Sequence, residues 1–132
     1  MTGEMEQAAA MRDAFDRIEE AYEFMLAYAA QGRKREVGDG GGESQIRHYL
    51  TRFDAALVDL EAALQGGLGG DAGAAFTDRV RYDVAATRSV IGLLLSRSSI
   101  TSDMVDNSNG LIALRALLTD IFFIDQAVLP ER

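Results

Sequence analysis

The sequence contains no cysteine, and it contains only one histidine, one proline and one lysine. Without cysteine the chain cannot form a disulfide, a thiolate nucleophile or a cysteine-ligated zinc site. A single histidine, His48, cannot supply the paired Glu-x-x-His motifs of a di-iron bundle, and no serine-histidine-acid set is visible around it. We therefore expect a protein that is not an enzyme and that carries no metal or other cofactor.

Positive charge is scarce, because 13 lysine and arginine residues face 21 aspartate and glutamate residues, and the net charge is -8 at pH 7. Nucleic-acid binding and association with an anionic membrane surface both need a basic face, so we expect neither. The longest apolar stretch, Leu111–Pro130, has the length of a membrane span. However, Arg115, Asp120 and Asp125 interrupt it, and each is costly in hydrocarbon. The first 20 residues lack the apolar segment of a signal peptide, so we expect a cytoplasmic protein.

Two glycine-rich stretches, 32–42 and 66–73, and a polar stretch, 96–103, divide the chain into four segments with helical periodicity. No segment alternates with the period of two that is typical of a strand. We predict one all-α domain over residues 1–132, an up-down-up-down four-helix bundle with a long first helix and a largely buried fourth helix. The helices are expected at about 4–31, 44–65, 74–96 and 102–129. The last helix starts either at Ser102 or only after Gly110, and we favour Ser102 because Met104 and Leu111 continue its apolar stripe. The stretch GDGGGES, residues 38–44, is expected to be a flexible linker.

The predicted fourth helix is apolar around most of its circumference. One stripe consists of Leu111, Leu114, Leu118 and Phe122, and we assign it to the core of the bundle. A second stripe, a third of a turn away, consists of Leu117, Ile121, Ile124 and Val128. Leaving these four side chains in water would forfeit roughly 6–12 kcal/mol, which is comparable with the stability of a whole domain.

Something must therefore cover the second stripe. We expect a homodimer that packs this stripe against its copy. The alternatives are that the chain covers the stripe itself or that a different protein does. A second contact surface is predicted at Phe24 and Tyr28, which lie four residues apart and away from the main seam of the first helix. These aromatic residues either line a wide core face or anchor an interface.

Two aspartates occupy positions where the helical pattern calls for apolar residues, Asp83 in the third helix and Asp125 in the fourth. A buried carboxylate must find a partner or change its protonation state. We predict Arg115 as the partner of Asp83, either in a structural ion pair or in a polar pocket between the two helices. Two aspartates without histidine make a poor transition-metal site, whereas they suit a basic ligand.

These features predict a non-enzymatic protein that acts through protein-protein packing, such as an adaptor, a chaperone or an assembly subunit. The alternative is a small-ligand-binding or sensing bundle with a polar pocket near Asp83 and Asp125.

Overall fold

The computed structural model describes residues 2–38 and 44–131. Within these ranges the chain is helical and has no strand, which confirms the all-α prediction. The α-helices are α1 (Thr2–Ala29), α2 (Gln45–Ala63), α3 (Ala74–Leu95), α4 (Ser102–Asn109) and α5 (Ile112–Phe123). Two 3-10 turns, Leu64–Gly66 and Gly70–Gly73, connect α2 to α3, and a π-helical turn, Ile124–Val128, follows α5.

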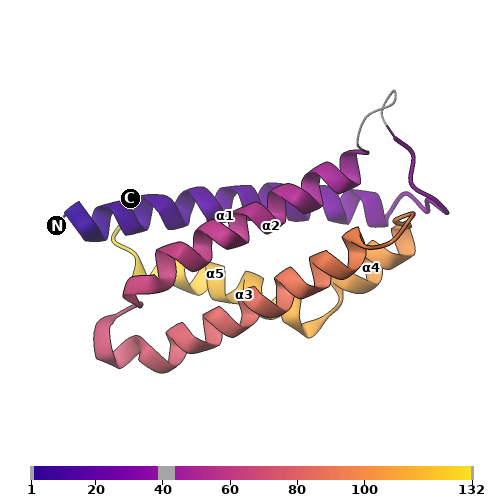
Figure 1. Ribbon diagram of the computed structural model, residues 1–132. Helices are drawn as coiled ribbons and strands as arrows, with labels where there is room; N and C mark the ends of the chain where they lie inside the picture. Colours follow the sequence, from indigo (N-terminus) through magenta and orange to yellow (C-terminus); the bar gives the residue numbers. More distant parts are fainter. Residues whose placement is uncertain (1, 39–43, 132) are drawn as a thin grey trace.

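The helices lie along a common long direction in two layers (Figure 1). One layer holds α1 and α2 side by side, and the other holds α3 beside the shorter α4 and α5. α1 packs against α2 and α4, while α5 packs mainly against α3. The two ends of the described chain lie near each other at one end of the molecule (Figure 1).

The second helix follows the sequence pattern closely. Ser44 caps its start, because the Ser44 hydroxyl accepts a hydrogen bond from the Arg47 backbone N–H. The predicted apolar stripe is buried, with Ile46, Leu50, Phe53, Leu57 and Leu60 each at most 1% exposed. α2 therefore forms for local reasons and is held by its burial against α1 and α3.

The turn between α2 and α3 depends on a close backbone approach at Gly73. A β-carbon at this position would lie 1.7 Å from the Leu68 carbonyl oxygen, so a larger residue would force the backbone apart. Leu68 is buried, and its N–H donates to the Thr77 hydroxyl at 3.0 Å. The glycine-rich stretch is thus a packed turn that sets the position of α3 against α2.

The prediction of one continuous helix over 102–129 is wrong. α4 ends at Asn109 with Gly110 as its cap, and Leu111 has an extended backbone with φ -67° and ψ 142°. Glycine is unfavourable inside a helix by about 1 kcal/mol relative to alanine, and here it marks a break. The break allows α4 to pack against α1 while α5 packs against α3. The chain therefore has five helices in the described ranges and not the four of the predicted bundle.

The structure reverses the assignment of the two apolar stripes of the last helix only in part, because Leu114 of the first stripe is buried as predicted. Leu117, Ile121 and Ile124 are buried in the core of the single chain, and Val128 is half-buried. By contrast, Leu111 is 44% exposed and Phe122 is 60% exposed. The chain itself covers the second stripe, so the predicted interface through these residues is wrong. Because α5 starts anew after Gly110, the stripe of α4 does not dictate its orientation.

Candidate functional site

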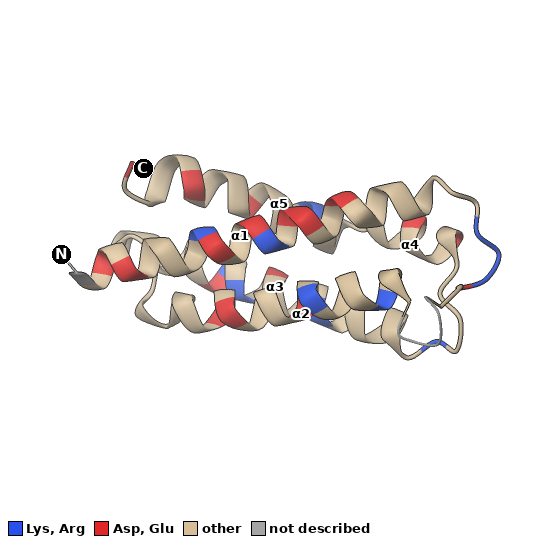
Figure 2. Ribbon diagram, turned by 90° about the horizontal axis from the view of Figure 1, so that it is seen from above, with Lys and Arg blue, Asp and Glu red and all other residues tan. Residues whose placement is uncertain are grey.

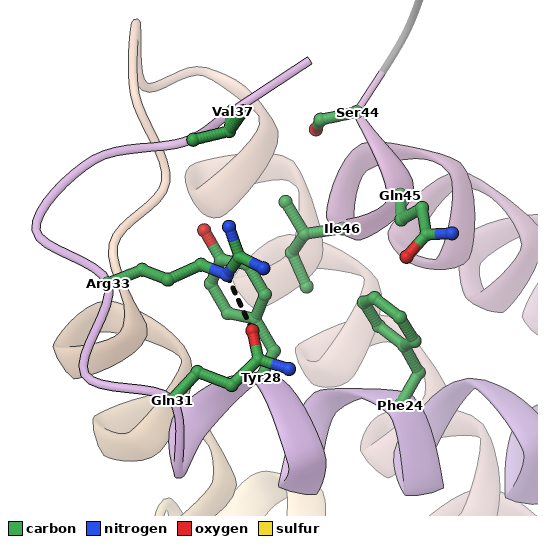
Figure 3. Close-up of a pocket in the computed structure, with 8 residues that line it drawn as sticks. All are labelled: Phe24, Tyr28, Gln31, Arg33, Val37, Ser44, Gln45 and Ile46. Atoms are coloured by element: carbon green, nitrogen blue, oxygen red, sulfur yellow. Dashed lines mark hydrogen bonds between the residues drawn. The ribbon is translucent and has the colours of Figure 1, made fainter. Parts of the chain in front are cut away.

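Phe24 and Tyr28 lie at the end of α1, where the chain turns toward α2 (Figure 3). Tyr28 is 4% exposed, and its hydroxyl donates to the Ile100 carbonyl. Phe24 is half-buried and stacks on Tyr49 of α2, with ring centroids 4.3 Å apart. The two aromatic residues therefore line a wide core face. Burial of Tyr28 agrees with the core face, whereas for the half-buried Phe24 the interface stays a prediction.

A cavity of about 160 Å³ opens beside these aromatic residues (Figure 3). The Arg33 side chain lies over the Tyr28 ring at 5.7 Å and donates to the Gln31 side-chain oxygen. These contacts occupy the one charged side chain of the cavity, and the remaining wall mixes apolar side chains with the neutral polar side chains of Gln31, Ser44 and Gln45. We therefore assign no ligand to this cavity.

The segment that follows Arg33 is held in place by a half-buried carboxylate, Glu36. Glu36 accepts hydrogen bonds from the Ser44 hydroxyl, from Arg47 Nε at 2.7 Å and from the Ile100 N–H at 3.1 Å. Burial opposes ionisation of Glu36, but these hydrogen bonds outweigh it and hold its pKa below the ordinary value. The backbone of Arg33 and Glu36 also hydrogen-bonds to Ser102 and Ser99, so residues 33–36 are anchored. The flexible linker predicted for 38–44 falls mostly on residues 39–43, which lie outside the described residues.

Asp83 is buried, but its predicted partner is wrong. The carboxylate is 1% exposed and pairs with Arg79, one turn earlier on α3, whose Nε lies 3.2 Å from Oδ2 and whose Nη2 lies 3.0 Å from Oδ1. Arg115 is exposed on the outer side of α5. The orientation of α5 turns Arg115 away from α3, and a partner four residues away on the same helix is always within reach.

The side chain that faces Asp83 across the helix interface is Asp120 of α5. Asp120 is 9% exposed, and its carboxyl group lies close enough to that of Asp83 for the two to interact. Burial, and then the neighbouring Asp83 carboxylate, raise the pKa of Asp120 to about 7. The sequence held a signal for this site, since Asp120 lies within the stripe formed by Leu117, Ile121 and Ile124. We missed it because that stripe was assigned to an interface.

Asp125 has a different environment. It pairs with Arg12 of α1, with Arg12 Nε 3.0 Å from Oδ1 of Asp125. Arg12 also donates to the Pro130 carbonyl at 2.6 Å, which ties the end of the chain to α1. Asp83 faces α5 and Asp125 faces α1, so the two aspartates do not line the common pocket that the sequence analysis proposed.

Two grooves contain exposed apolar side chains. One, of about 250 Å³, lies between α1 and α5 and is lined by Glu19, Tyr22, Glu23, Leu118 and Phe122. We call it the α1–α5 groove. The other, of about 350 Å³, lies between α3 and α4 and is lined mainly by Val90, Leu93, Leu94, Met104 and Leu111. The α1–α5 groove differs from the groove between α3 and α4 in having an acidic edge, which Glu19 and Glu23 form. Acidic residues are spread along α1 (Figure 2).

Comparisons with protein-family models, with curated proteins and with solved structures find no match to this chain. Among the described residues, no three histidine, aspartate or glutamate side chains are grouped so that they could hold a metal ion. In the same part of the chain, every helix is too short or too polar to cross a membrane.

Proposed function

We propose that this protein is a non-enzymatic interaction protein, and that its α1–α5 groove binds a basic, amphipathic helical segment of a partner. The observation that carries the proposal is an apolar groove with an acidic edge. Phe122 is 60% exposed, and Leu118 and Tyr22 beside it are half-buried. Glu19 and Glu23 are exposed on the α1 side of the same groove.

The shape of the groove favours a helix as its occupant. A groove between two helices accepts the apolar side chains that a third helix presents at i, i+3, i+4 and i+7. Burying an aromatic side chain such as Phe122 contributes roughly 1.5–3 kcal/mol, and exposed aromatic residues commonly dominate the energy of an interface. The two glutamates lie one helical turn apart, so they would face lysine or arginine residues along one edge of the bound helix.

Charge favours a different protein over a second copy of this chain. A two-fold dimer through the α1–α5 groove would bring the glutamates of both copies toward the same seam. The net charge of -8 adds repulsion between copies over the whole surface. Opposite charges across an interface raise the association rate and suppress wrong partners. The homodimer that the sequence predicts is therefore the less favoured occupant.

A peptide-binding experiment tests the proposal. The probe is a fluorescein-labelled 16-residue helical peptide with leucines on one face and lysines on the other, and a version with glutamates in place of the lysines serves for comparison. Fluorescence anisotropy should show binding of the lysine peptide alone. Phe122→Asp should weaken this binding at least about tenfold, because it removes an aromatic anchor. Leu93→Asp is the matched control, since Leu93 is 67% exposed but lies in the other groove, and it should leave the affinity unchanged.

Equal affinity for Phe122→Asp and Leu93→Asp would show that the peptide is attracted only by overall charge, which would contradict the proposal. Light scattering on a sizing column tests the dimer separately. We expect the mass of one chain, 14.3 kDa. Twice that mass, reduced to one chain by Phe122→Asp, would assign the groove to a second copy instead.

A further inference from the structure

We propose that Asp83 and Asp120 share a proton that joins α3 to α5, and that the fold is consequently less stable at neutral pH than at mildly acidic pH. This inference does not depend on the proposed function, because it concerns the interior of the fold and not the α1–α5 groove.

The geometry of the two carboxyl groups requires a proton between them. Both side chains are at least nine-tenths buried, and they face each other from adjacent helices. Oδ1 of Asp83 lies within ion-pair distance of Arg79 but accepts no hydrogen bond from it, and Oδ2 of Asp120 is likewise buried without a donor. Carboxylate oxygens only accept hydrogen bonds, so two ionised groups would repel each other. One shared proton converts this repulsion into a hydrogen bond that satisfies both oxygens.

Arg79 offsets this repulsion only in part, since the pKa of Asp120 stays raised despite its charge. Arg79 is the cation that faces the pair, and its guanidinium is directed at Asp83 from the solvent side, with 56% of its side chain exposed. Three other charged side chains on neighbouring elements make contacts away from the pair. Arg88 pairs with Asp54, Arg81 donates to the Leu64 carbonyl, and Asp125 pairs with Arg12.

The sign of the pH dependence follows from the direction in which folding changes the affinity for the proton. Folding raises the pKa of Asp120 to about 7 from an ordinary value of 3.8, mainly through burial and then through Asp83. Between these values the folded chain holds a proton that the unfolded chain releases. The stability from this proton is complete below the unfolded value, decreases as the pH rises, and is lost once the pH passes the folded value.

The pair also lies where it can affect the outer surface of α5. Asp120 is on the inner side of the helix, and Leu118 and Phe122, within the same turn, face the α1–α5 groove. Loss of the proton weakens the contact between α3 and α5, and α5 forms one wall of that groove. The acid pair is therefore a pH-sensitive device built into the helix that carries the exposed aromatic residue.

Urea denaturation at pH 5.5 and pH 7.5, at constant ionic strength, tests the proposal. The folding equilibrium constant of the natural chain should fall by up to about 20-fold relative to that of Asp120→Asn over this range. The asparagine side chain cannot ionise, and its amide can donate to Asp83, so the variant should fold and lose this pH dependence. Histidine is the side chain that ordinarily changes charge near this pH, so His48→Gln is the matched control. It should behave like the natural chain.

A second measurement keeps the test decisive if Asp120→Asn fails to fold. The carboxyl carbon of Asp120, observed by NMR in the natural chain, should titrate near neutral pH. Titration below pH 5, or the same pH dependence in the natural chain and in Asp120→Asn, would overturn the proposal. Magnesium chloride added at pH 7.5 should not restore stability. If it restored stability in the natural chain but not in Asp120→Asn, the pair would hold a divalent cation, which would also overturn the shared proton.

Discussion

The half of the molecule formed by α1 and α2 differs from the half formed by α3, α4 and α5 in what it buries. Among the described residues, the buried polar side chains other than Ser44 are all in the second half: Thr77, Asp83, Thr87, Ser102, Ser108 and Asp120. Large apolar side chains are also exposed more often in the second half, at Tyr82, Leu93, Leu111, Ile112, Phe122 and Phe123. The rest of the described chain exposes Met5, Leu26, Val37 and Val58.

The two halves therefore differ in how cleanly they separate apolar from polar side chains. α1 and α2 separate apolar from polar residues cleanly, and ion pairs such as Arg17–Asp59 and Arg52–Glu20 join them on the outside. The second half keeps carboxylates inside and aromatic residues outside, although both arrangements reduce its stability. An exposed apolar patch and a buried ionisable pair are the features through which a fold can bind a partner or respond to its surroundings.

Adjacent aspartate substitutions in α5 should have the largest effects and provide the sharpest test of this comparison. Ile121 is 2% exposed, so Ile121→Asp buries an unpaired carboxylate, and the cost should exceed the stability of an ordinary domain. Phe122 is 60% exposed, so Phe122→Asp should stay folded. Circular dichroism on heating measures both. A cooperative melt of Ile121→Asp close to that of the natural chain would show that the inner side of α5 is wrongly assigned.

Removal of one aromatic ring from each half should give the next largest difference. Phe53 in α2 is fully buried, so Phe53→Ala should lower the free energy of unfolding by roughly 3–5 kcal/mol. Phe123 in α5 is 53% exposed and contacts Phe76 edge to face at 5.3 Å, so Phe123→Ala should lower it by about 1 kcal/mol. Urea denaturation at pH 6 compares the variants, and equal losses would remove the distinction between the two halves.

Two arginine substitutions should give the smallest effects and still separate the halves. Arg17→Gln removes an exposed ion-pair partner of Asp13 and Asp59, and it should lower the free energy of unfolding by less than about 1 kcal/mol. Arg79→Gln removes the cation beside Asp83, which is 1% exposed, and it should cost roughly 1–3 kcal/mol. Denaturation at one pH and salt concentration decides this. A larger loss for Arg17→Gln would reverse the comparison.

The local pattern was sufficient to predict α2, including its serine cap and its buried stripe. The local pattern was not sufficient to predict which side of the last helix faces the core, because two apolar stripes on that helix had the same helical periodicity. Burial of Asp83 was also visible from the pattern, since it interrupts an otherwise apolar face. The partner of Asp83 was not visible from the pattern. Arg79 is one turn away on the same helix and Arg115 is on the facing helix, and only the orientation of α5 excludes Arg115.

Sequence alone determined the all-α class, most helix boundaries and the buried stripe of α2, because these depend on neighbours three or four positions away. The tertiary structure decided which stripe of α5 faces the core, that Asp83 meets Asp120, and that Phe122 lies at an acidic groove. The physical reason is the break at Gly110 and Leu111. It frees α5 to rotate, so that contacts with α3 rather than the local pattern set its orientation.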